Sequence, residues 1–173
     1  MKNIQTPLKD DVVKHLKAGD RISLSGIVYT ARDQAHKRLC QLIENKSQLP
    51  IDLKEQIIYY TGPTPAQKEA VIGSCGPTTS HRMDDYTIPL LQTGLKGMIG
   101  KGKRNDNIEK AMSEYNAIYF IAIGGLGALL SSYVKKCEEI AFMDLGTESI
   151  KKLTVEAFPL FVANDAHGVS IFS

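Results

Sequence analysis

The chain has 173 residues, of which 43% are hydrophobic and 23% are charged. This length predicts one domain with a sizeable core, and this composition excludes an intrinsically disordered chain. Lys and Arg total 21 against 19 Asp and Glu, so the formal charge of +2 gives no indication of nucleic-acid binding.

Strands and helices alternate in the first half of the chain. Apolar–polar alternation predicts strands, whereas apolar residues three or four positions apart predict helices. Thr78 or Thr79 is expected to cap one helix, which Pro89 kinks or shortens. In order, we expect a helix at 9–16, a strand at 20–30, a helix at 31–45, strands at 57–61 and 70–75, and then the capped helix.

The second half of the chain continues this alternation and ends in strands. In order, we expect a strand at 95–99, a basic loop at 100–107, a helix at 108–115, a strand at 117–123, a helix at 125–135, a strand at 137–143, a helical turn at 146–151, and strands at 153–158 and 161–172. This pattern predicts an α/β fold with some antiparallel pairing. No repeat or linker divides the sequence, so residues 1–173 are expected to form a single domain.

Neither a membrane span nor a secretory signal is expected. The longest apolar run, residues 117–130, has 14 residues including three glycines, whereas a span needs about 20 apolar residues. The first residues lack the apolar stretch of a secretory signal. Cys40, Cys75 and Cys137 are odd in number and lie 35 and 62 residues apart, which argues against disulfides and against a metal cluster held by this chain. We therefore expect a cytoplasmic protein.

Three segments carry the polar groups from which a site could be built. In the first, Arg32, Asp33 and His36 point in a similar direction from a predicted helix. Arg32 follows an apolar strand, at the end of the sheet where α/β proteins bind ligands. A solvated, charged helix face would show the same pattern and remains the alternative.

The second segment, residues 73–84, places three hydroxyl residues at a predicted helix start. Thr78, Thr79 and Ser80 follow a glycine–proline turn, and N–H and O–H donors gathered in this way bind carboxylate or phosphate. Arg82 lies one turn from Thr78 and could add a bidentate contact. Simple helix capping is the alternative here.

The third segment, residues 97–104, is rich in glycine and basic residues. From Lys96 to Arg104 there are four cations and no acid, but the spacing of a P-loop is absent. Glycines near Lys101 would let the backbone approach an anion closely while the ammonium group binds it. The alternative is a flexible basic surface loop. Together the three segments suit a small polycarboxylate or a phosphate.

A nucleotide-binding α/β domain is a different class of interpretation. Gly124, Gly125 and Gly127 follow an apolar strand, and Asp144 comes about 20 residues later. The G-x-G-x-x-G spacing fails, however, and close packing between helix and sheet explains the glycines better.

Four longer motifs lie at 30–38, 60–63, 76–84 and 98–102, and shorter ones at 123–125, 141–146 and 162–168 extend them. Together they resemble the C-terminal domain of class I fumarate hydratases, which occurs as a separate β subunit in two-component versions of the enzyme. The resemblance covers nearly the whole chain, and L-tartrate dehydratase β subunits share the G-P-T-T element. It implies a single α/β domain of the swivelling β/β/α type, with mixed sheets and helices.

The resemblance also implies roles for individual residues. The threonine of the G-P-T-T element that acts as the base at the substrate carbon corresponds to Thr78. The lysine corresponds to Lys101, with Lys103 nearby. The residues that bind the two carboxylates of the substrate correspond to Arg32, Thr79, Arg82 and Lys101.

The cofactor and the partner follow from the same resemblance. The [4Fe-4S] cluster of the family is held by a partner α subunit, and this chain is expected to bind no metal, no nucleic acid and no membrane. The expected enzyme is an α2β2 hydro-lyase that hydrates fumarate reversibly to L-malate, with L-tartrate as the second choice of substrate. A non-catalytic ligand-binding subunit is the alternative if no α partner exists.

Overall fold

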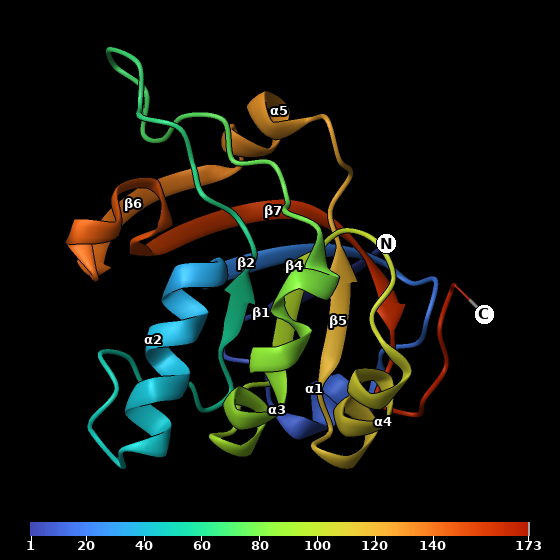
Figure 1. The fold of residues 1–173 in the computed structure, drawn as a ribbon. Helices are drawn as coiled ribbons and strands as arrows, with labels where there is room; N and C mark the ends of the chain where they lie inside the picture. Colours follow the sequence, from blue (N-terminus) through green and yellow to red (C-terminus); the bar gives the residue numbers. More distant parts are fainter. Residues whose placement is uncertain (173) are drawn as a thin grey trace.

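The computed structural model describes residues 1–172, which are organised by one seven-stranded sheet (Figure 1). The strand order is β1-β2-β3-β4-β5-β7-β6. The strands are β1 (Lys2–Gln5), β2 (Arg21–Thr30), β3 (Ile57–Tyr59), β4 (Gly97–Gly100), β5 (Ile118–Ile121), β6 (Val134–Ala141) and β7 (Ile150–Asn164).

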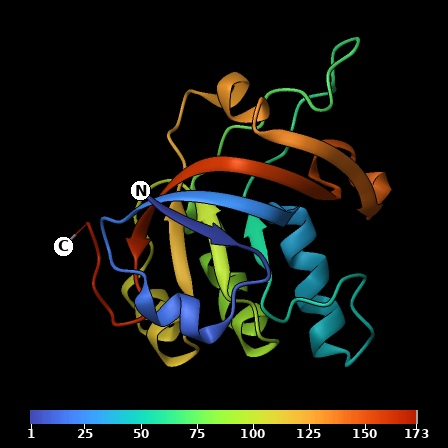
Figure 2. The same cartoon turned by 180° about the vertical axis from the view of Figure 1, so that it is seen from behind.

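An additional pairing between β2 and β7 closes the sheet into a small barrel-like ring. Strands β2, β3, β4 and β5 pair in parallel, so their carboxyl ends point to one end of the ring. The long strand β7 runs antiparallel to both β5 and β2 and completes the closure. Strand β1 pairs in parallel with β2 and lies beside it when the molecule is seen from behind (Figure 2).

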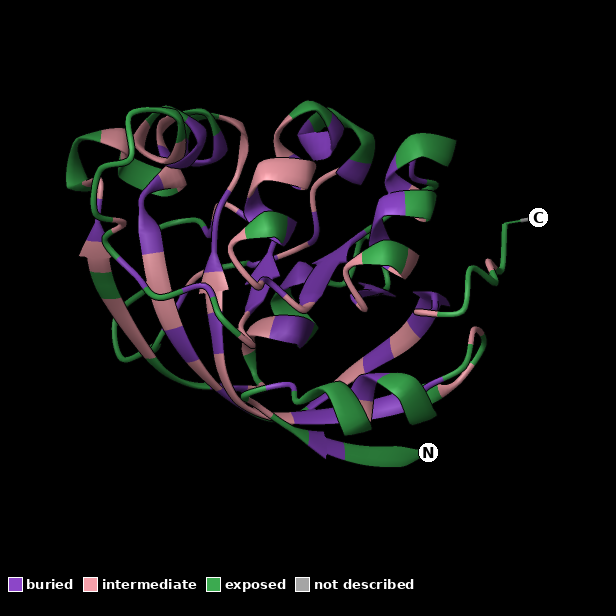
Figure 3. Ribbon diagram, turned by 90° about the horizontal axis from the view of Figure 1, so that it is seen from below, coloured by how far each residue is buried: buried purple, intermediate pink, exposed green. Residues whose placement is uncertain are grey.

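Helices α2, α3 and α4 cover the outer face of the parallel strands (Figure 1). Exposed residues lie on the sides of the helices that face away from the sheet, and the strands are largely buried (Figure 3). The helices are α1 (Asp10–His15), α2 (Asp33–Glu44), α3 (Asp84–Gln92), α4 (Asp106–Glu114) and α5 (Gly127–Ser131), with two 3₁₀ helices, η1 (Ser80–Met83) and η2 (Met143–Glu148).

Two apolar cores lie on the two faces of the parallel strands. Tyr59 and Phe120 belong to the core inside the ring, whereas their neighbours Ile58 and Tyr119 belong to the core beneath the helices. Successive side chains of a strand point to opposite faces, so strands buried on both faces read as continuous apolar runs. This is why β3 and β5 show no apolar–polar alternation in the sequence.

The mixed α/β class predicted from the sequence is confirmed. Strands β2 to β5 and helices α1, α2 and α4 lie within about two residues of the predicted ranges. The sequence analysis did not predict β1, which has four residues of which only Ile4 is buried. Such a short strand gives too little alternation to be recognised.

The strand predicted at 70–75 is wrong, because this segment is an irregular loop. Two hydrogen bonds join one part of the loop to another: Thr64 N–H donates to the Ser74 carbonyl (3.0 Å), and Ser74 N–H donates to Thr64 Oγ1 (2.9 Å). The helix predicted at 125–135 is also too long, since α5 has five residues and β6 begins at Val134.

The two strands predicted near the C-terminus form one strand, β7, which continues through Pro159. Pro159 lies opposite Ser23 of β2, beyond the β6 pairing that ends at Val155 and before the β5 pairing that begins at Phe161. With a neighbouring strand on one side only, the missing N–H of proline costs little. None of the helices in residues 1–172 is both long and apolar enough to cross a bilayer.

Candidate functional site

The loops that follow β2, β3, β4 and β5 meet at one end of the ring. Arg32 follows β2 and packs against Gly62, the third residue after β3, where a Cβ would lie 3.1 Å from Arg32 Cδ. Lys101 follows β4 and lies beside Gly124 of the loop after β5, where a Cβ would lie 3.6 Å from Lys101 Cδ. The carboxyl ends of parallel strands are the usual ligand-binding edge of an α/β sheet.

The residues 78–80 are fixed by backbone hydrogen bonds to the same strand ends. Thr78 N–H donates to the Tyr60 carbonyl (2.6 Å), and Ser80 N–H donates to the Lys101 carbonyl (3.0 Å). Thr79 forms an isolated parallel bridge with Lys101. Thr79 precedes η1 but makes no side-chain capping bond, so simple helix capping does not explain its hydroxyl.

Ser80 joins this segment to two neighbouring strands. Its Oγ accepts a hydrogen bond from Lys101 N–H (3.1 Å) and lies 2.8 Å from the Tyr119 hydroxyl. Gly100 leaves room for Ser80, because a Cβ at that position would overlap Ser80 Oγ. Burial raises the pKa of Tyr119, so this hydroxyl stays protonated. The backbone that carries Lys101 is therefore fixed even though its side chain is exposed.

The predicted basic loop is not entirely a surface loop. Arg104 is 1% exposed, and its Nε donates to Asp84 Oδ1 at 2.5 Å. Its two Nη atoms donate to the Tyr60 hydroxyl (3.2 Å) and to Thr87 Oγ1 (2.7 Å), while Asn105 N–H donates to Asp84 Oδ2 (2.9 Å). This buried network fastens the loop after β4 to the first turn of α3.

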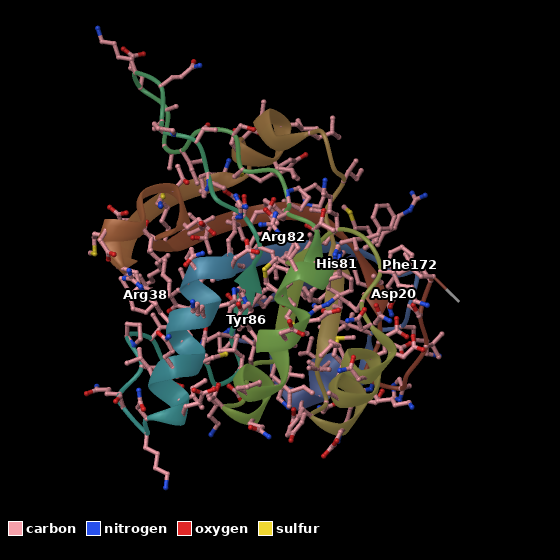
Figure 4. All side chains as sticks on the ribbon, in the orientation of Figure 1. Asp20, Arg38, His81, Arg82, Tyr86 and Phe172 are labelled. Carbon is pink, nitrogen blue, oxygen red and sulfur yellow. The ribbon has the colours of Figure 1, made fainter. Side chains whose placement is uncertain are left out.

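Arg32 and Arg82 are brought together by a carboxylate. Asp33 Oδ1 accepts a hydrogen bond from Arg82 Nε (3.0 Å) and lies 3.0 Å from Arg82 Nη2. Arg32 Nη2 lies 3.7 Å from Asp33 Oδ2, and Arg32 Nε lies 3.8 Å from Glu148 Oε1. Figure 4 shows Arg82 at the sheet end of the helix layer, and 48% of its side chain is exposed.

The five predicted site residues therefore lie at one end of the ring, around the ends of β2, β3 and β4. Lys103 lies further along the loop, where its exposed side chain pairs with Asp106 at 3.8 Å. Sequence reasoning missed Glu148, Asp84 and the buried state of Arg104. Glu148 is 116 residues from Arg32 in the sequence and belongs to no motif. The two residues come together only in the folded, closed sheet, so the sequence gives no signal of their contact.

His36 does not share the exposed face predicted for it with Arg32. It is fully buried, its Nδ1 lies 2.8 Å from the Arg32 carbonyl, and its ring stacks edge-on against Tyr60 at 5.2 Å. Burial lowers the pKa of His36 to about 4, so the ring is neutral at physiological pH. Its contacts support the start of α2 rather than a ligand.

We expect the burial of His36 to weaken the fold in acid. The pKa is about 4 in the folded chain against 6.5 for the free residue, so between these values the unfolded chain binds the extra proton. Stability is therefore fully present above pH 6.5 and falls as the pH drops towards 4. From pH 7 to pH 5 this residue should remove about 2 kcal/mol from the free energy of unfolding. Urea denaturation of the wild type and of His36→Gln at both pH values measures the difference, and equal losses in the two proteins would contradict it.

The three cysteines do not fit an iron–sulfur cluster. Cys40 is buried beside the Tyr86 carbonyl, and Cys75 is buried in the ring core. Burial raises the pKa of Cys40 to about 11 and that of Cys75 to about 12, so both are neutral core thiols. Among residues 1–172, no group of three or more His, Cys, Asp or Glu side chains could hold a metal ion.

Gly127 of the 124–127 loop serves packing, whereas a Cβ at Gly125 would meet nothing within 4 Å. The close approach at Gly127 argues against the nucleotide interpretation. A Cβ at Gly127 would lie 2.8 Å from the Gly76 nitrogen, and the Cys75 N–H donates to the Gly127 carbonyl (3.2 Å). Asp144 forms hydrogen bonds of 2.8 and 2.5 Å with Arg38 on the surface, as expected of a structural ion pair.

A cavity of about 500 Å³ lies beside η2, between β6 and the loop after β3. Its walls are mainly apolar and include Pro63, Val71, Ile72 and Met143. None of the five predicted site residues lines it, so this cavity is not part of the candidate site.

Comparisons with known proteins give matches over nearly the whole chain. A family model described as "Fumarase C-terminus" matches residues 2–173. The chain is 40% identical over 166 residues to a protein of Methanocaldococcus jannaschii named "Putative L(+)-tartrate dehydratase subunit beta", covering 92% of this chain and 85% of that protein. It is 36% identical over 178 residues to "Fumarate hydratase 1, mitochondrial" of Leishmania major, covering 99% of this chain. It is 35% identical over 175 residues to "Fumarate hydratase class I, anaerobic" of Escherichia coli, covering 98% of this chain. The chain spans 32% of the length of each of these two fumarate hydratases.

Proposed function

Because the chain belongs to the Fumarase C-terminus family, we propose that it is the β subunit of a hydro-lyase that hydrates fumarate reversibly to L-malate. The observation that carries the proposal is the convergence of three cationic side chains, Arg32, Arg82 and Lys101, at one end of the ring. Asp33 and Glu148 are the two carboxylates that pair with the arginines there. The site thus keeps one positive charge in excess, which suits an anionic ligand.

L-tartrate dehydration is the second candidate function. The specific observation that favours it is the similarity to a tartrate dehydratase subunit beta over 85% of that protein's length. Tartrate and malate are both dicarboxylates that carry a hydroxyl group next to a carboxylate. The three cations Arg32, Arg82 and Lys101 would therefore bind either substrate.

In the proposed mechanism, Arg32, Arg82, Lys101 and Thr79 hold the two substrate carboxylates. Removal of a proton next to a carboxylate moves negative charge onto that carboxylate. Guanidinium and ammonium groups already in place stabilise this charge without having to reorganise. A guanidinium binds a carboxylate through two parallel hydrogen bonds, so the arginines also orient the substrate.

Thr78 is proposed to move the proton at the substrate carbon. In the dehydration direction its oxygen accepts the proton, and in the hydration direction it returns the proton. A threonine hydroxyl is a weak base near neutral pH and needs a neighbouring group to activate it. We propose a carboxylate of the partner subunit for this role, because the site faces outward from the ring.

The residues of this chain do not fit the [4Fe-4S] cluster that the family resemblance implies, so the proposal assigns the cluster to a partner α subunit. The name of the tartrate dehydratase relative, a subunit beta, supports the existence of such a partner. We further propose an α2β2 assembly in the cytoplasm, where a reducing environment suits three free cysteines.

Anaerobic co-expression with a candidate α subunit tests the proposal. The assembled enzyme should interconvert fumarate and malate, and parallel assays on L-tartrate decide between the two candidate substrates. Arg82→Ala should raise KM and lower kcat in the same assays, because it removes a carboxylate contact. Turnover of malate by the isolated chain, or inactivity of the assembled enzyme on all three compounds, would contradict the proposal.

A further inference from the structure

The carboxylate of Asp33 occupies a special place between the two arginines. Asp33 is the first residue of α2, and Arg32 before it has extended backbone angles. One oxygen contacts Arg82 at 3.0 Å through both Nε and Nη2, and the other faces Arg32 Nη2 at 3.7 Å. A single carboxylate therefore links two cations that come from different elements, α2 and η1.

The surroundings of Arg32 are not those of an ion pair optimised for stability. Arg32 Nε, Asp33 Oδ2 and Glu148 Oε1 are all buried, yet none of them has a hydrogen-bond partner. Such groups are costly, and they concentrate where a protein keeps polar groups ready for a function. The carboxylates of Asp33 and Glu148 lie 3.7 and 3.8 Å from Arg32 nitrogens, so they attract its charge without forming hydrogen bonds.

The contact to Arg82 has a geometric consequence. A guanidinium offers two edges, each with two N–H groups, and Asp33 takes the Nε–Nη2 edge. The Nη1 edge is directed away from Asp33 and can meet a second carboxylate. An arginine side chain loses rotamer entropy when it is fixed, and the contact to Asp33 fixes this half-exposed side chain before any ligand binds.

We propose that Asp33 is a positioning residue that sets the separation and orientation of Arg32 and Arg82 for the two carboxylates of the substrate. This inference rests on the proposed function for the nature of the ligand. Asp33 itself carries a negative charge and is not a ligand of the substrate. It acts through Arg82 by hydrogen bonding and through Arg32 by its charge.

The assembled enzyme provides the kinetic test. Asp33→Asn should raise KM for the dicarboxylate about tenfold and change kcat less than about threefold, because the arginines become misplaced for binding. Asp144→Asn is the matched control. It removes the exposed ion pair with Arg38, which like Asp33 is a residue of α2, and KM should stay unchanged. An unchanged or lower KM for Asp33→Asn would overturn the inference. It would show that the Asp33 carboxylate only repels the substrate carboxylates and does not position the arginines.

A second readout on the full chain alone does not depend on activity. In ¹H–¹⁵N spectra, the Nε–H of Arg82, assigned with Arg82→Lys, should exchange with water about tenfold faster in Asp33→Asn than in the wild type. Asp144→Asn should leave this exchange rate unaltered. Equal rates in wild type and Asp33→Asn would overturn the inference. Inactivity of the assembled wild type on every substrate, together with the expected exchange rates, would reject the proposed function and support the placing of Arg82 by Asp33.

Discussion

Replacing Thr78 by alanine in the assembled enzyme is expected to lower kcat about 10²–10⁴-fold, the usual contribution of a positioned acid–base group. The backbone should keep its place, because Thr78 N–H donates to the Tyr60 carbonyl and alanine retains that donor. KM should change little, since the carboxylate-binding residues are untouched. Steady-state kinetics on fumarate and on malate measure both constants.

Two further variants separate the hydroxyl group from the shape of the side chain. Thr78→Ser keeps the hydroxyl and should retain much more activity than Thr78→Val, which keeps the shape alone. Gel filtration of each variant with the α subunit checks that assembly survives. A Thr78→Val enzyme with wild-type turnover would show that this hydroxyl does not move the proton.

Replacing Arg104 by methionine is expected to cost about 3–5 kcal/mol of folding free energy. The loss arises because the Asp84 carboxyl group, which is 4% exposed, would be left buried without its cation. Urea denaturation of the isolated chain at pH 7 measures the change. Because the same network fastens the loop after β4 to α3, the variant should also lose activity at temperatures where the wild type is stable.

Two controls belong to the Arg104 experiment. The double variant Arg104→Met, Asp84→Leu removes both charges and should recover part of the lost stability, as buried pairs replaced by apolar residues often do. Lys103→Ala breaks the exposed pair with Asp106 and should leave the stability almost unchanged. A loss for Arg104→Met no larger than that for Lys103→Ala would contradict a structural role of the buried pair.

Local patterns in the sequence were sufficient to predict most of the elements that build the ring and its helix layer. Strand β2 shows clear apolar–polar alternation. Helix α2 has apolar residues on one face, and two of them, Ala35 and Leu39, lie in the core. Motifs predicted the candidate residues as well, because Thr78, Arg82 and Lys101 stand in short segments that directly follow or precede regular elements. Their roles in the reaction remain predictions.

Long-range contacts could not be predicted in this way. The four cations between Lys96 and Arg104 suggest a solvated loop, and nothing local indicates that Arg104 finds Asp84, twenty residues earlier, in the interior. Glu148 meets Arg32 only because η2 lies between two strands of the closed sheet. The loop at 70–75 was mistaken for a strand because Ile72 and Cys75 are buried in the ring core, although the segment pairs with no neighbouring strand.

Closure of the sheet by β7 also determines where a second copy of the chain could add a strand. Within the described residues, only β1 and β6 end the strand order with one side unpaired. Strand β1 has four residues, three of them exposed, and β6 carries a row of charged side chains that includes Lys135, Lys136, Glu138 and Glu139. Short edge strands and charged edge strands of this kind discourage the addition of another strand. The chain is thereby protected against polymerising into fibrils through its own backbone.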